Sequence, residues 1–256
     1  MSTSAAIETT LLGGKLKLRQ LRAGHRSGTD AVLLSALIGK TDGTIVDLGA
    51  GAGAAGLALA SRNPSCRLIL AEIEPQLASI AEENARLNGI EDRTRVAVAD
   101  ILQPGARKDA GLQDNCADVL ITNPPYQDEA SSRVSPDPLK ARAHALMSDG
   151  PNRAGAFDRW MRACAALLRP GGVFAMIHRA DALDSVVSGC RGRFGALQIV
   201  PVYSKASRPA IRVLVRGVAG SRGPLSLRPG LILHQADGAF SKKAAAIHSG
   251  TAALFD

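Results

Sequence analysis

The sequence predicts an α/β fold in which a mostly parallel sheet has helices on both faces and an antiparallel hairpin at its C-terminal edge. Two observations lead to this prediction: short β-rich runs alternate with longer helical runs, and the chain of 256 residues is 46% hydrophobic, enough for a full core. The β-rich runs are residues 44–48, 67–72, 95–98, 117–122 and 173–178. Strands that alternate with helices in this way are typical of parallel sheets.

The clearest helix is expected at residues 75–88. Leu77, Ile80 and Leu87 lie on one helical face, Pro75 suits the first turn, and Asn88 with the glycine after it suits the end. Two further helices are predicted at residues 29–38 and 152–168.

The C-terminal part does not continue the alternation of strands and helices. The runs 199–203 and 211–215, joined across 204–209, predict an antiparallel hairpin, and residues beyond Gly220 predict a loose tail with one more strand at 231–234. The expected organisation is therefore an N-terminal segment (residues 1–40), a central α/β domain (41–220) and a C-terminal tail (221–256).

Charge indicates the kind of partner. The formal net charge is +8 and the pI is near 9.7. An excess of Lys and Arg favours a polyanion such as RNA, although solubility alone also explains a modest excess. Aromatic residues make up only 3% of the chain, so the core is expected to consist of Ala, Val, Leu and Ile.

Four separated cysteines look like small buried apolar residues, with no C-x-x-C pair and no metal constellation: Cys66, Cys116, Cys164 and Cys190. The sequence shows no signal-peptide pattern and no uninterrupted apolar stretch of about 18 residues. We expect a reduced, soluble, cytoplasmic protein with no metal and no membrane partner.

A glycine loop, Asp47 to Gly53, follows the first strand of the sheet. Glycines there allow a tight turn and a close approach of a ligand to the backbone. Gly51, Gly53 and Gly56 also fit the G-x-G-x-x-G dinucleotide fingerprint, and Glu72 follows at about the expected distance of twenty residues, so a nicotinamide cofactor is a possible reading.

Acidic residues at three strand ends favour a different cofactor. Asp47 suits an ammonium group, Glu72 ends the second strand, and Asp100, after the third, can meet an adenine amine. The alternative for each of the three is an ordinary turn or surface residue without a ligand. Open α/β sheets bind their ligands at the carboxyl ends of the strands, where all three lie.

The turn Asn123-Pro124-Pro125-Tyr126 ends the fourth strand. Prolines fix φ near −65° and donate no backbone hydrogen bond, so Asn123 and the Pro124 carbonyl can present acceptors to a planar amine while Tyr126 offers a stacking face. Hydride transfer does not need such a turn. A proline-rich turn without a function is the plain alternative.

These motifs resemble class I S-adenosylmethionine-dependent methyltransferases, and among them the small-domain amino-methyltransferases with an Asn-Pro-Pro-Tyr motif. Gly28-Thr29-Asp30 before the sheet and Ser207 to Ala210 before the last strand are most similar to the bacterial valine-tRNA adenine N6-methyltransferases. The resemblance implies a Rossmann-like fold with a mostly parallel seven-stranded sheet and S-adenosylmethionine as cofactor. It also implies that residues 1–40 cover substrate and cofactor and that residues 41–220 are the catalytic domain.

The resemblance also implies roles for particular residues. The catalytic turn is Asn123, Pro124, Pro125 and Tyr126, and the cofactor-binding residues are Asp30, Asp47, Gly49, Gly51, Gly53, Glu72, Asp100 and Ile101. We expect the turn to hold the exocyclic amine of adenine, in tRNA next to the anticodon, for direct transfer of the methyl group. Gln127 stands where the family often has a second aromatic residue.

Basic residues near these motifs are candidates for contacting RNA: Lys15, Lys17, Arg19, Arg142 and Arg208. The first three alternate with leucines, so they also suit the wet face of a strand. The long segment 127–149 is predicted to be a lid on the substrate side.

Other acceptors and one other function remain open. The same turn in related enzymes methylates the glutamine amide of a translation release factor, and a guanine amine in ribosomal RNA is a further variant, which Tyr126 makes less favourable. A non-catalytic RNA-binding protein that kept the fold is the alternative of another class.

Overall fold

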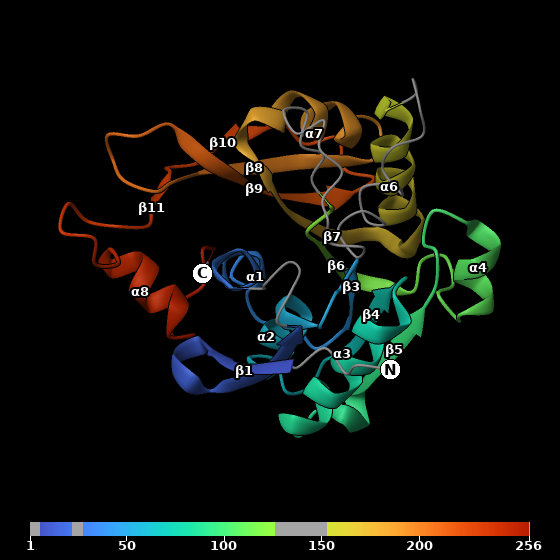
Figure 1. Ribbon diagram of the computed structural model, residues 1–256. Helices are drawn as coiled ribbons and strands as arrows, with labels where there is room; N and C mark the ends of the chain where they lie inside the picture. Colours follow the sequence, from blue (N-terminus) through green and yellow to red (C-terminus); the bar gives the residue numbers. More distant parts are fainter. Residues whose placement is uncertain (1–5, 22–27, 126–152, 256) are drawn as a thin grey trace.

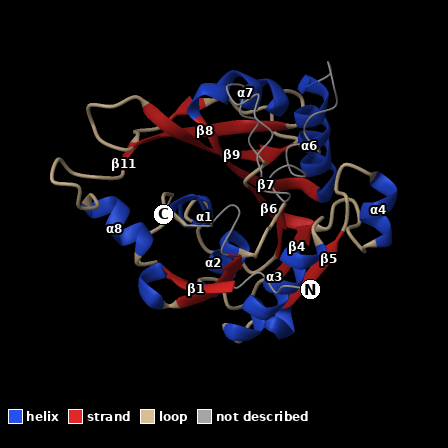
Figure 2. Ribbon diagram, viewed as in Figure 1, coloured by secondary structure: helices blue, strands red, loops and turns tan. Residues whose placement is uncertain are grey.

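The computed structural model describes residues 6–21, 28–125 and 153–255, and it confirms the predicted α/β fold (Figures 1 and 2). Among these residues nine strands form one sheet in the order β10-β8-β9-β7-β6-β3-β4-β5, with β11 paired to β8. Its strands are β3 (Thr44–Leu48), β4 (Arg67–Glu72), β5 (Thr94–Val98), β6 (Ala117–Thr122), β7 (Leu168–Arg179), β8 (Phe194–Tyr203), β9 (Ala210–Ala219), β10 (Ser226–Leu227) and β11 (Leu231–Ile232).

The long strands reproduce the expected mixed sheet. Strands β5, β4, β3, β6 and β7 pair in parallel, and β9 pairs antiparallel with both β7 and β8. The predicted seven-stranded sheet with an antiparallel hairpin is therefore confirmed, and the two-residue strands β10 and β11 extend it along β8.

Helices cover both faces of the sheet (Figure 1). One hydrophobic cluster joins one face to α1, α2, α3 and α8, and a second joins the other face to α6 and α7. The helices are α1 (Thr29–Ser35), α2 (Ala54–Ser61), α3 (Pro75–Leu87), α4 (Pro104–Asp109), α6 (Arg153–Leu167), α7 (Leu183–Cys190) and α8 (Lys242–His248), with short 3-10 turns η1 (Leu12–Gly14), η2 (Glu91–Arg93) and η3 (Ala180–Ala182).

Helix α3 ends where its sequence signals place it. Pro75 occupies the first turn, where its missing N–H has no helical partner, and Gly89 takes a φ of +64° just past Asn88, so that Ile90 N donates back to the Ala85 carbonyl (3.1 Å). The predicted helix at residues 29–38 is shorter, because α1 ends at Ser35.

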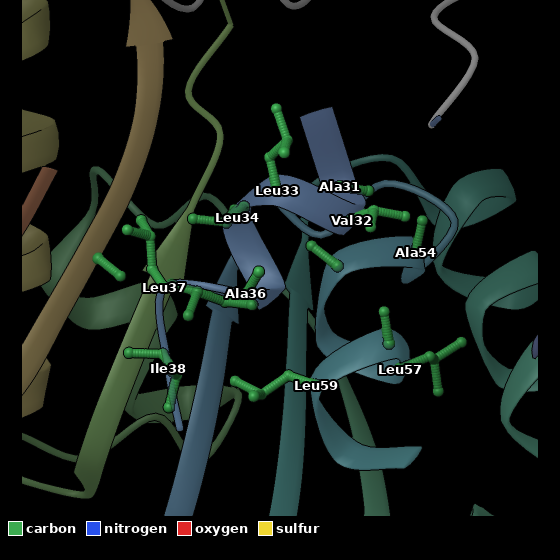
Figure 3. Packing of buried hydrophobic residues seen from close by; sticks show 14 of the residues in the cluster. Ala31, Val32, Leu33, Leu34, Ala36, Leu37, Ile38, Ala54, Leu57 and Leu59 are labelled. Carbon is green, nitrogen blue, oxygen red and sulfur yellow. The ribbon is translucent and has the colours of Figure 1, made fainter. Parts of the chain in front are cut away.

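Helices α1 and α2 pack against each other through small and branched side chains, which Figure 3 shows at close range. Leu34, Leu37, Leu57 and Leu59 are completely buried there. Burial of one such leucine contributes about 1.5–3 kcal/mol. This contact fixes α2, and therefore the glycine loop before it, on the sheet.

A separate antiparallel hairpin, β1 (Ala6–Leu11) and β2 (Leu16–Leu21), packs on α3. Asn84, fully buried on α3, accepts from Arg19 N (2.7 Å) and donates to the Arg19 carbonyl (3.0 Å) and to the Ala52 carbonyl (2.9 Å). One side chain thus joins the hairpin to the glycine loop.

The expectation of a loose tail beyond Gly220 is wrong. Two short strands pair with β8, and helix α8, capped by the Ser241 hydroxyl, packs on α1 and η1. Leu231, Leu233, Ala244 and Ile247 lie in the same core cluster as the sheet and the N-terminal hairpin. The three segments expected from the sequence therefore share a core.

Within the described residues, no helix is long and apolar enough to cross a membrane, and no three His, Cys, Asp or Glu side chains gather closely enough to hold a metal ion. All four cysteines are free thiols; Cys66, Cys164 and Cys190 are buried as predicted, whereas Cys116 is half-buried.

Candidate functional site at the carboxyl edge of the sheet

Most of the predicted cofactor residues meet at one edge of the sheet. β3 lies between β4 and β6, and β5 follows β4, so the chain leaves four adjacent parallel strands at the same edge. The glycine loop, Glu72, Asp100 and the Asn123 turn each follow one of these strands.

The glycine loop turns sharply over the end of β4. Gly49, Gly51 and Gly53 have φ values of +74°, +57° and +85°, in the left-handed region that favours glycine. Gly49 N and Ala50 N both donate to the Ala71 carbonyl (2.9 and 3.0 Å). No heavy atom of the described residues lies within 4 Å of the position that a Cβ would take at Gly51, so among them this side of the loop is open to a ligand.

Asp47 lies beneath the loop with only 2% of its surface exposed. Its Oδ2 accepts from Gly56 N in the first turn of α2 (2.8 Å). Burial, with a smaller contribution from the charge of Glu72, raises the pKa of Asp47 to about 7 although the Gly56 bond opposes the shift. A cationic group placed nearby restores the ionised form.

Glu72 closes the other side of the loop. Its Oε2 accepts from Gly51 N (2.7 Å), and its Oε1 accepts from Ile73 N (2.8 Å) and Glu74 N (3.0 Å). Burial raises the pKa of Glu72, while these backbone bonds lower it. The carboxylate can accept from one further donor such as a ribose hydroxyl, because Oε2 keeps a second lone pair.

Asp100 and Ile101 follow β5 beside Glu72. Ala99 N donates to the Glu72 carbonyl (3.0 Å), which holds the end of β5 against β4. Asp100 Oδ1 accepts from Leu102 N (3.0 Å), and Ile101 is 5% exposed in the hydrophobic cluster. The pair thus offers a half-buried carboxylate and an apolar wall.

The turn after β6 is described as far as Pro125, and Tyr126 lies outside the described residues. Asn123 and Pro125 are half-buried, and Pro124 is buried. Because the β3–β6 pairing ends with Leu48 opposite Thr122, Asn123 begins the turn level with the start of the glycine loop.

Thr122 and Trp160 belong to this edge although no sequence motif marks them. The Trp160 indole Nε1 donates to Thr122 Oγ1 (3.1 Å), and Thr122 Oγ1 donates to the Leu48 carbonyl (2.8 Å). The sequence offers two signals that these residues belong to the site: Thr122 directly precedes the Asn123 motif, and Trp160 is the single tryptophan of the chain.

Asp30 lies in the first turn of α1, where Arg212 of β9 pairs with it (Nε to Oδ2, 3.0 Å). Arg212 lies opposite Arg179, the last residue of β7, so the pair is at the carboxyl edge. The structure thus joins Asp30 to β9, and its predicted contact with the cofactor remains a prediction.

The predicted RNA-contacting residues do not form one group. Arg208 is exposed in the turn between β8 and β9, at the carboxyl edge. Arg19 pairs with Glu8 and Glu83, and Lys17 N donates to Asn88 at the far end of α3. Lys15 donates to the Ser249 carbonyl next to α8.

Lys15, Lys17 and Arg19 therefore lie on the exposed face of the hairpin. Going back from Leu21, the strand leads away from the glycine loop. Leu21, at the end of β2, packs on Ala52, and the chain from Leu21 back to residue 15 spans about 20 Å. Arg142 and the predicted lid at 127–149 lie outside the described residues.

The groups around the glycine loop fit a nucleoside that carries an amino-acid chain. They comprise a buried carboxyl group for an ammonium, a glycine cradle, a carboxylate for ribose and a carboxylate with an apolar wall for adenine. These are the side chains of Asp47, Glu72 and Asp100 around Gly49 to Gly53, described above.

Known proteins resemble this chain in sequence and in structure. The family model described as methyltransferase small domain matches residues 26–152. The tRNA1(Val) (adenine(37)-N6)-methyltransferase of Aeromonas hydrophila is 29% identical over 226 residues, 87% of this chain and 88% of that protein. The release factor glutamine methyltransferase of Moorella thermoacetica is 31% identical over 167 residues, 64% of this chain and 56% of that protein, so the chain spans just over half of that relative.

Among solved structures, a predicted O-methyltransferase from Agrobacterium tumefaciens, protein Atu636, superposes with a TM-score of 0.73. It is 31% identical, and the superposition covers 88% of this chain and 98% of that one.

Proposed function

The chain belongs to the S-adenosylmethionine-dependent methyltransferases of the methyltransferase small domain family, and we propose that it N-methylates an exocyclic amine, adenine N6 in tRNA next to the anticodon. The observation that carries the proposal is the position of the Asn123 turn on β6, directly beside the glycine loop on β3. Under this proposal, the methyl donor and the acceptor amine bind at adjacent strand ends.

S-adenosylmethionine is the methyl donor of this family. We propose that Asp47 meets its ammonium group, Gly49 to Gly53 cradle its amino-acid end, Glu72 binds the ribose and Asp100 with Ile101 binds the adenine. When bound, it supplies a sulfonium-linked methyl group that an amine can attack.

The Asn123 turn acts on the acceptor. The Asn123 side-chain oxygen and the Pro124 carbonyl accept hydrogen bonds from the amine, so its lone pair is released from conjugation with the ring and aimed at the methyl group. Orientation of this kind contributes much of the acceleration, since a well-held pair reacts at a high effective concentration. The extra proton then leaves to water.

The base must leave its stack to reach the turn, and this costs a few kcal/mol, least in a single-stranded loop. Tyr126, the next residue of the motif, is proposed to offset part of this cost by stacking, which is worth about 1–3 kcal/mol.

Two observations support tRNA as the substrate. The tRNA methyltransferases of Aeromonas hydrophila and Porphyromonas gingivalis match 87% and 89% of this chain and 88% of their own length, so the likeness includes the C-terminal hairpin. The net charge of +8 and the exposed Arg208 at the carboxyl edge suit a phosphate backbone.

A release factor glutamine amide is the second candidate. The release factor glutamine methyltransferase of Moorella thermoacetica is 31% identical to this chain over the part that the two share, close to the 29% of the tRNA methyltransferase of Aeromonas hydrophila. A glutamine amide also presents the same flat NH2 group as adenine. The likeness covers only 64% of this chain, which favours the tRNA reading.

Labelled S-adenosylmethionine offered with unmodified tRNA and, separately, with a release factor tests the proposal. We expect label in N6-methyladenosine after nuclease digestion and nucleoside chromatography, and none in the release factor. Asn123→Ala should abolish transfer and leave the affinity for S-adenosylhomocysteine within about threefold, because Asn123 holds only the acceptor. Label in glutamine alone overturns the tRNA assignment, and equal loss of transfer and cofactor binding overturns the role of Asn123.

A further inference from the structure

Thr122, Trp160 and Leu48 form a chain of hydrogen bonds beneath the site, which we name the brace. The Trp160 indole donates to the Thr122 hydroxyl, and that hydroxyl donates to the Leu48 carbonyl (3.1 and 2.8 Å). Thr122 and Leu48 are completely buried, and Trp160 is 5% exposed. The brace therefore works where water does not compete for the same bonds.

Both ends of the brace adjoin a functional segment. Leu48 is the residue before Gly49, and Thr122 is the residue before Asn123. The strand pairing ends at this level, with Leu48 opposite Thr122, and Pro124 and Pro125 have no N–H with which to continue it. The Thr122 hydroxyl thus makes a cross-strand bond where the chain leaves the sheet.

The ring of Trp160 also supports the glycine loop directly. A Cβ at position 49 would lie 2.9 Å from Trp160 Cη2 and 3.1 Å from Cζ2, so the indole rests against the Gly49 backbone. One side chain from α6 therefore touches the loop and bonds to the strand that carries the turn.

We propose that Thr122 and Trp160 are positioning residues that hold the glycine loop and the Asn123 turn at a fixed separation; this rests on the proposed methyl transfer. Thr122 has a single hydroxyl proton, which it gives to Leu48, so its oxygen is left to accept from Trp160. A misplacement of about 1 Å between reacting groups can slow a reaction about a hundredfold. Neither residue needs to touch donor or acceptor.

Thr122→Val tests the brace because it removes both bonds and keeps the shape of the side chain. Thr122→Ser restores the hydroxyl, and Trp160→Phe removes the indole N–H. Thr94→Val is the matched control, since Thr94 Oγ1 donates to a backbone carbonyl, that of Ile90 (2.7 Å), at the start of β5 on the opposite edge.

Amide hydrogen exchange tests, without any enzymatic turnover, how firmly the brace holds the glycine loop and the Asn123 turn. Gly49 N and Ala50 N are bonded to the Ala71 carbonyl, and their exchange reports on the loop. In Thr122→Val we expect these two amides and that of Asn123 to exchange at least about tenfold faster, with no change in Thr94→Val or Thr122→Ser. Unchanged exchange at the loop overturns the proposal.

Kinetics then separate positioning from a loss of binding. At saturating S-adenosylmethionine and tRNA, Thr122→Val should lower kcat at least about tenfold while the Kd for S-adenosylhomocysteine stays within about threefold. Thr122→Ser and Thr94→Val should keep kcat near that of the parent protein. A kcat in Thr122→Val within about threefold of the parent value overturns the positioning role of the brace and leaves the proposed function intact. A parent protein that methylates no amine refutes the proposed function, while the exchange data still decide whether the brace exists.

Discussion

Binding of S-adenosylhomocysteine is expected to release close to one proton from Asp47. This carboxyl group is 2% exposed, and its burial raises its pKa to about 7. An ammonium group beside it favours the charged form and lowers that pKa. S-adenosylhomocysteine carries the same ammonium as the methyl donor and cannot react, so binding alone is measured.

The magnitude follows from the pKa of about 7. At pH 6 about nine in ten Asp47 groups are protonated in the free protein, so up to about 0.9 protons leave when the ammonium group lowers the pKa of Asp47 well below its value in the free protein. At pH 8 about 0.1 protons leave. By linkage, the affinity at pH 6 is about tenfold weaker than at pH 8.

Titration calorimetry in two buffers of different ionisation enthalpy counts the protons. Asp47→Asn should release none and should bind with little dependence on pH between 6 and 8. Glu72→Gln is the control that keeps most of the release, because the partner proposed for Glu72 is an uncharged ribose hydroxyl. Proton release near zero in the parent protein, or equal release in Asp47→Asn, would refute the reasoning.

Three further predictions concern residues around the site. Gly51→Ala and Gly192→Ala should each lower the free energy of unfolding by about 1 kcal/mol, because their φ values are +57° and +71° and the described residues leave open space around the new Cβ. Only Gly51→Ala should weaken S-adenosylhomocysteine binding in calorimetry, and a Kd equal to that of the parent protein would contradict the cradle. Asn84→Ala should lower the free energy of unfolding in urea by about 3 kcal/mol, because the Ala52 carbonyl and the hairpin lose buried partners; a change below about 1 kcal/mol would be inconsistent with this. Burial lowers the pKa of His178 to about 4, so as the pH falls from 6.5 to 4 the unfolded chain binds the proton first and the folded protein loses up to about 3 kcal/mol; urea unfolding across that range should show no such loss in His178→Gln.

Local signals allowed the sheet and its main helix to be predicted from the sequence. Pro75 and Gly89 act within one turn of the chain, and they fix the ends of α3 to within a residue. The motifs after β3, β4, β5 and β6 were each read at a strand end, and parallel pairing brings such ends together.

Features that depend on distant partners were missed. Helix α8 has seven residues and is held by Ala244 and Ile247 against α1, a contact between the two ends of the chain that no local pattern reveals. Trp160 lies in a helix whose sequence does not show that its indole reaches Thr122 and Gly49.

The predicted RNA-contacting residues of the hairpin show a related difficulty. The alternation of Lys15, Lys17 and Arg19 correctly indicates an exposed strand face, but the direction of that face depends on how the hairpin docks on α3. Docking is set by Asn84, which is distant in the sequence, so the sequence alone cannot place these cations.

A crystal structure with S-adenosylhomocysteine and an RNA stem-loop that contains the acceptor adenine tests the central claim most directly. We predict the adenine N6 within about 3.2 Å of both Asn123 Oδ1 and the Pro124 carbonyl, with the cofactor sulfur on its other side. A cofactor bound away from the glycine loop, or an acceptor amine that does not reach the Asn123 turn, would contradict the account.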